Sequence, residues 1–195
     1  MGLLGGGSRL SVAPPGRLTR IVRPRDFPTM RHGEYLGEIL GFLEQVGLEV
    51  RREQIEADTF LPGIAIRAGA VVLDESKLEW PGDLLHEAGH LAVLPPAERS
   101  RASDALQNLP QLQGAGELEA MAWAYAAACH LNLPLDVLFH EGGYKGNSKG
   151  LIRTYSLGVY PGVRGLCDAG MTTARGFTSN NTGAQYPEMI RWLHA

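Results

Sequence analysis

The stretch WPGDLLHEAGHLAVL, residues 80–94, decides the expected fold, because it combines a helix start, an amphipathic pattern and a helix stop. Pro81 suits the first turn of a helix, and the proline pair at 95–96 prevents the helix from continuing. At roughly 100° per residue, the leucines and alanines of this stretch gather on one side, with His86 and His90 together on the opposite side. The sequence therefore predicts a helix that buries one face in a core and presents two histidines on the other.

His86, Glu87 and His90 form an H-E-x-x-H motif on this helix. Two histidines four residues apart project from one face, one turn apart, so both imidazoles can bind a single Zn²⁺. Glu87 adjoins His86 and is placed to reach a metal-bound water rather than the metal, which is the position of a general base. The motif predicts a catalytic zinc site with His86 and His90 as ligands and Glu87 as the base.

A catalytic zinc needs a third protein ligand, and the candidates are Glu117, Glu119, His130, His140 and more distant acidic residues. Residues 117–131 are rich in alanine and predict a helix, on which Glu117 and Glu119 point to nearly opposite sides. Glu119 has small neighbours that would let its helix approach the histidine helix closely. Glu117 in the first turn has a sufficient role at the positive end of the helix dipole. We therefore expect Glu119 to be the third ligand.

Segments on either side of the two helices predict an α+β fold. Residues 64–67 and 70–73 flank Ala68-Gly69 and are typical of a β-hairpin or of one long strand with a kink, whereas residues 48–60 are ambiguous. Further helices are expected at 34–46, 135–140, 148–157, 161–169 and 187–194.

Together, these motifs resemble those of the gluzincin metallopeptidases, and more narrowly those of the small ImmA/IrrE-type zinc peptidases. In the pattern of the latter, alanine follows the third-ligand glutamate, and an aromatic residue and a second alanine come a few positions later. Glu119-Ala120 and Trp123-Ala124 fit this pattern, and the resemblance spans about residues 60–135. It implies a zincin-like fold, in which a small twisted sheet packs against the metal-binding helix and a second, glutamate-bearing helix. Residues 64–74 would then supply the edge strand that aligns a peptide substrate.

The resemblance also implies an activity, the zinc-dependent hydrolysis of peptide bonds in a peptide or protein substrate. The larger gluzincins often place an acidic residue four positions after the third ligand, where this chain has Trp123. The partner that orients a zinc histidine is therefore not identified by the motif. Tyr144, Tyr155 and Tyr160 all remain candidates for the donor that stabilises the oxyanion.

Composition indicates one globular unit in which 44% of the 195 residues are hydrophobic and 20% are charged, which excludes a disordered chain and a coiled coil. No run of 18 apolar residues is present, so no membrane span is expected. Two cysteines are too few for a disulfide framework. Without a recognisable targeting signal, we expect a cytoplasmic protein.

Charge divides the chain into three parts. Residues 1–31 hold six arginines and one acidic residue, and we expect an irregular basic N-terminal strap lying on an acidic body. Residues 32–140 are the expected zincin-like core, and residues 141–195 a glycine-rich C-terminal extension packed on it. Two alternatives remain, a zinc-binding regulatory module without peptidase activity and a DNA-associated regulator that uses the basic arm. No aromatic residue lies among the arginines before Phe27, which argues against nucleic acid as a partner.

Overall fold

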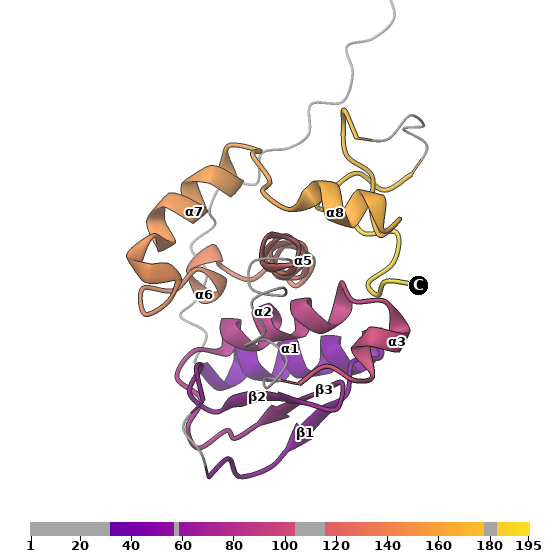
Figure 1. Cartoon of the computed structure of the whole chain (residues 1–195). Helices are drawn as coiled ribbons and strands as arrows, with labels where there is room; N and C mark the ends of the chain where they lie inside the picture. The colour runs from indigo at the N-terminus through magenta and orange to yellow at the C-terminus, as the bar shows by residue number, and fades with distance from the viewer. Residues whose placement is uncertain (1–31, 57–58, 104–115, 178–182) are drawn as a thin grey trace, which may run out of the picture.

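Three short strands and a set of helices make up an α+β fold (Figure 1). The computed structural model describes residues 32–56, 59–103, 116–177 and 183–195. The predicted strap at residues 1–31 lies outside these ranges. In chain order the elements are α1 (His32–Val46), β1 (Val50–Arg52), β2 (Ile64–Arg67), β3 (Ala70–Leu73), α2 (Pro81–Ala92), α3 (Pro96–Arg99), α5 (Glu117–His130), α6 (Leu135–Leu138), the 3₁₀ turn η1 (Tyr144–Gly146), α7 (Ser148–Ser156) and α8 (Val163–Asp168).

Within the sheet the strand order is β1-β3-β2, with β1 parallel and β2 antiparallel to β3. Ala68 and Gly69 join β2 to β3 with φ values of 49° and 77°, the positive pair that a tight two-residue hairpin requires. The hairpin prediction is therefore confirmed, and a single kinked strand is excluded. Because β3 is paired on both sides, the expectation that the whole segment 64–74 forms a sheet edge is wrong. Within this segment only β2 is an outer strand of the described sheet, and β1 is the outer strand on the other side.

Two helices, α1 and α2, cover one face of the sheet, and α5 lies on the far side of α2, where Figure 1 shows it end-on. Gly89 permits the close approach of α2 and α5, because a Cβ atom at this position would lie 2.6 Å from the carbonyl oxygen of Ala120. α6 and α8 also contact α5, and the alanines of α5 are buried on all sides. α5 is thus enclosed by other elements, and its first turn lies against α2.

After α8 the chain returns to α2 and α5 without forming the helix predicted at residues 187–194. The N–H groups of Ile190 and Arg191 donate to the carbonyl oxygen of Met171 rather than to residues of the same turn. The N–H of His194 donates to Ala92, and the indole N–H of Trp123 donates to the carbonyl oxygen of Trp192. These hydrogen bonds to distant segments replace the helical ones, so the helix prediction is wrong.

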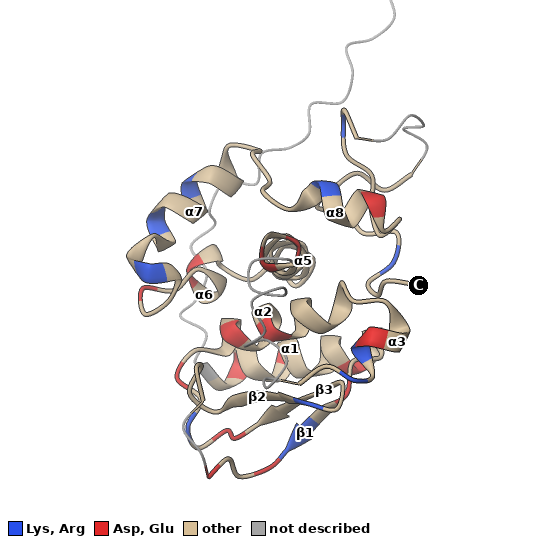
Figure 2. Cartoon of the chain, viewed as in Figure 1, with Lys and Arg blue, Asp and Glu red and all other residues tan. Residues whose placement is uncertain are grey.

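Acidic residues occur along α1 and α2, whereas the charged residues of α7 are basic (Figure 2). The charge division seen in the sequence is therefore retained in space between the sheet side of the molecule and its C-terminal part. In the ranges that the structure describes, no helix has both the length and the apolar character needed to cross a membrane.

Candidate metal centre

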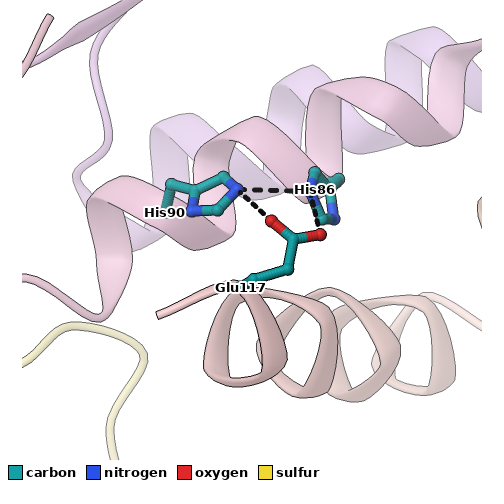
Figure 3. A group of neighbouring side chains, drawn as sticks. All are labelled: His86, His90 and Glu117. Carbon is teal, nitrogen blue, oxygen red and sulfur yellow. Dashed lines mark hydrogen bonds and ion pairs between the residues drawn. The ribbon is translucent and has the colours of Figure 1, made fainter. Parts of the chain in front are cut away.

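α2 places His86 and His90 one turn apart on the side that faces α5 (Figure 3). Their Nε2 atoms are 3.2 Å apart, and the ring planes meet at 87°. The side chain of His86 is 11% exposed and that of His90 is 23% exposed. Both imidazoles therefore turn the same atom toward a common point at the edge of the helix interface.

Glu117 reaches this point from the first turn of α5 (Figure 3). Its Oε1 lies 3.4 Å from Nε2 of His86, and its Oε2 lies 3.3 Å from Nε2 of His90. One ligand atom from each of the three residues lies within 4.8 Å of the others. Two imidazole nitrogens and one carboxylate are a donor set that Zn²⁺ accepts, and three protein ligands leave one coordination position for water or substrate. The three residues could therefore hold a zinc ion and leave a coordination position open.

Glu119, the expected third ligand, does not join the histidines, and the carboxylate that lies beside them is that of Glu117. Glu119 turns toward α8, where a Cβ atom at Gly165 would lie 2.6 Å from its Oε1. Small residues occur on every side of α5, so they cannot mark the side that faces α2. That side is set by the contact of Gly89 with Ala120, and Ala120 lies three residues after Glu117 on the same helix face.

Electrostatics at the three side chains favour a cation. Hydrogen bonds from His86 and His90 hold the pKa of Glu117 well below its usual range. Burial of His86 opposes protonation, but the hydrogen bond and charge of Glu117, with the charges of Glu87 and Asp83, outweigh it and raise the pKa of His86. The negative charges of Glu117, Glu87 and Asp83 around His86 therefore favour positive charge at this point.

Glu87 keeps the position that the motif predicts, half-buried on α2 beside His86. Its charge helps to raise the pKa of both His86 and Tyr144, which places its carboxylate near the group. His130 lies at the other end of α5, between the rings of Phe42 and Trp192, and takes no part in the site.

Asp83 and His140 form a buried pair close to the histidines. Nε2 of His140 lies 2.7 Å from Oδ1 of Asp83, and the His140 ring stacks on Trp80 with centroids 4.5 Å apart. Burial raises the pKa of Asp83, although the hydrogen bond from His140 opposes this. The sequence places Asp83 one turn before His86 on the same helix, whereas nothing local indicates that His140, 57 residues later, packs there.

Among the three candidate tyrosines, only Tyr144 lies against the site, with its ring centroid 6.0 Å from that of His86. The hydroxyl of Tyr155 donates to the carbonyl oxygen of Pro161, and Tyr160 packs against Tyr186. The sequence alone does not show which of the three tyrosines lies near the histidines, because their positions depend on tertiary packing.

Comparisons of the chain with protein-family models, with curated proteins and with solved structures found no match. The side chains around His86, His90 and Glu117 are therefore the basis of the functional assignment.

Proposed function

We propose that the protein is a zinc-dependent metallopeptidase with a zincin-like fold, similar to the small gluzincins that its H-E-x-x-H motif resembles. The observation that supports this most directly is the convergence of His86, His90 and Glu117 from two helices, with Glu87 next to the first ligand. A purely structural zinc site usually has four protein ligands and needs no adjacent base. Three ligands and an intact Glu87 favour hydrolysis over a zinc-binding module without activity.

In this mechanism each residue has a separate task. His86 and His90 act as neutral imidazoles that bind through Nε2, while Glu117 supplies the negative charge that offsets part of the ion's charge. Zn²⁺, when bound, acts as a Lewis acid and lowers the pKa of a coordinated water to about 7. Glu87 accepts the proton of the attacking water and passes it to the leaving amine.

Zinc binding and hydrolysis are tested separately with three matched variants. Protein is stripped with chelator, titrated with zinc, and assayed by amine release from unfolded casein. The wild-type protein should bind one zinc ion per chain. Glu117→Gln should bind zinc at least about 100-fold more weakly, because it loses the only charged ligand. Glu119→Gln should bind as the wild type does. Glu87→Gln should keep its zinc but lose hydrolysis by about 10²–10⁴-fold.

Three outcomes would contradict parts of this proposal. Weak zinc binding by Glu119→Gln together with normal binding by Glu117→Gln would reverse the assignment of the third ligand. Wild-type turnover by Glu87→Gln would refute the mechanism. Stoichiometric zinc in a wild-type protein that cleaves no peptide bond would favour the regulatory zinc module.

A further inference from the structure

Tyr144 has a backbone conformation that bulky residues rarely adopt. Its φ is 54°, and the next residue, Lys145, has φ 54° and ψ 34°. A non-glycine residue in the left-handed region costs on the order of 1 kcal/mol or more and persists only when its surroundings impose it. The position of the Tyr144 ring is therefore imposed by packing rather than chosen by the local chain.

The packing that imposes this conformation connects the turn to the helix of the zinc ligands. A Cβ atom at Gly142 would lie 2.8 Å from Nε1 of Trp80, and one at Gly143 would lie 2.9 Å from Cε1 of His140. The two glycines thus pass directly over the stacked rings of Trp80 and His140. His140 in turn is hydrogen-bonded to Asp83 on α2. The turn that carries Tyr144 therefore packs against a ring that is hydrogen-bonded to α2.

The hydroxyl of Tyr144 is buried and has no hydrogen-bond partner among the residues that the structure describes. Other buried tyrosines on this chain do have one, since the hydroxyl of Tyr155 donates to Pro161 and that of Tyr186 donates to Ala122. An unpaired buried hydroxyl costs about 1–3 kcal/mol, and such groups are rare except where they have a function. Tyr144 combines this cost with its unfavourable φ, beside the ring of a proposed zinc ligand.

The same surroundings keep the hydroxyl protonated. Burial raises the pKa of Tyr144, and the negative charges of Asp83, Glu117 and Glu87 raise it further. The group therefore remains a neutral hydrogen-bond donor throughout the neutral pH range.

We propose that Tyr144 is a catalytic residue, whose hydroxyl donates a hydrogen bond to the scissile carbonyl oxygen of the substrate as negative charge develops on it. The inference rests on the proposed peptidase function and adds the donor that the ligands and Glu87 do not supply. A donor fixed in advance by the protein stabilises the transition state more than the bound substrate. Tyr144 only donates a hydrogen bond and keeps its proton throughout the reaction. When the products leave, this hydrogen bond is lost and Tyr144 is in its starting state.

The test compares Tyr144→Phe with Tyr160→Phe, a control that removes a hydroxyl away from the site. In the zinc-loaded proteins, four quantities are measured: zinc content, urea midpoint, kcat and KM for peptide hydrolysis, and affinity for two small ligands. One ligand is a phosphoramidate dipeptide, whose tetrahedral anion mimics the transition state, and the other is a thiol dipeptide, which binds zinc through sulfur alone. Tyr144→Phe should retain zinc and stability, lose about 10²–10³-fold in kcat with a nearly unchanged KM, and bind the phosphoramidate at least tenfold more weakly. Its affinity for the thiol should not change.

Equal kcat values for Tyr144→Phe and Tyr160→Phe would overturn the proposal, and so would a parallel loss of affinity for both ligands. Loss of zinc or of the folded state in Tyr144→Phe would assign it a structural role and also reject the proposal. A wild-type protein that holds zinc, cleaves no peptide and does not bind the phosphoramidate would instead refute the peptidase function, and the role of Tyr144 with it.

Discussion

At the scale of single residues, Glu117 forms the contacts on which the proposed site depends, even without a metal. Its carboxylate pairs with both imidazoles, and this pairing requires an ionised carboxyl group and a protonated histidine. The raised pKa of His86 adds stability that is fully present below the unfolded-state value of about 6.5 and is lost as the pH rises through the folded-state value. The lowered pKa of Glu117 adds stability that is present above about pH 4.3 and is lost as the pH falls through its folded-state value.

This pairing predicts a pH-dependent cost for Glu117→Gln in metal-free protein. In excess chelator, the substitution should lower the free energy of unfolding by about 0.5–1 kcal/mol at pH 6, a modest value because water screens the half-exposed Glu117. At pH 9 the cost should be smaller, since the imidazole of His86 loses its proton as the pH rises through its raised folded-state pKa. Urea unfolding at the two pH values measures the difference, with Glu119→Gln as the control that should not follow the titration of His86. A cost for Glu117→Gln that stays constant from pH 6 to pH 9 would show that the ion pair adds no stability.

The positions of His86 and His90 could be predicted because their spacing alone sets them on one helix face, where the structure places them. The choice between Glu117 and Glu119 could not, because it depends on which face of α5 meets α2. That face is selected by the contact between Gly89 and Ala120, on helices that are separate in the sequence. The contribution of Asp83, His140 and Tyr144 has the same origin in non-local packing.

At the scale of elements, α2 and α5 approach each other closely at Gly89, one residue before His90. A side chain there would meet the backbone of Ala120, which cannot move without displacing the first turn of α5 and Glu117 with it. The interface thus links helix spacing directly to the geometry of the three proposed ligands.

Gly89→Ala should therefore lower the free energy of unfolding by about 1–3 kcal/mol and weaken zinc binding. Gly37→Ala is the matched control, since Gly37 is exposed on α1 and an added Cβ would meet nothing within 4 Å. The control should gain about 0.5–1 kcal/mol from the higher helix propensity of alanine and leave zinc affinity unchanged. Urea unfolding and zinc titration of both variants provide the comparison. Equal zinc affinities would show that the contact at Gly89 does not control the geometry of the proposed metal site.

Helices with a clear amphipathic or compositional pattern, α1, α2 and α5, appear where the sequence predicts them, as does the hairpin. β1 was ambiguous because it has only three residues, and it forms a strand by pairing with β3, a partner that no local pattern reveals. Residues 187–194 have helical periodicity, but their N–H groups find acceptors in distant segments. In each case a non-local hydrogen bond, rather than local preference, decided the outcome.

At the scale of the whole molecule, Arg99 connects the end of α2 to the C-terminus. Its guanidinium donates to the carbonyl oxygens of Leu91 and Leu94, both at 2.9 Å, and to that of His194 at 2.8 Å. A single side chain thus satisfies carbonyl groups at the helix end and holds a segment 95 residues further along the chain.

Arg99→Met should lower the free energy of unfolding by about 2–3 kcal/mol, because it leaves several partly buried carbonyl groups without their donor. The C-terminal residues should also become sensitive to carboxypeptidase. Arg101→Met is the control, since Arg101 is exposed and, within the described ranges, its guanidinium donates to the carbonyl oxygen of Ala97 in its own turn. Urea unfolding and timed digestion of both variants measure the effect. Similar results for the two variants would show that Arg99 does not hold the C-terminal segment against the end of α2.

Enclosure of α5 on all sides also limits how this protein can diverge. A surface helix tolerates substitutions on its solvent-exposed face. The alanines of α5 contact neighbouring elements in every direction, so a larger side chain at almost any of them would collide with a neighbour. On the surrounding helices, the side chains that face α5 can be substituted only where they still pack against its alanines. Variation among descendants should therefore accumulate on α1 and α7, while the alanine positions of α5 stay small on every face of the helix.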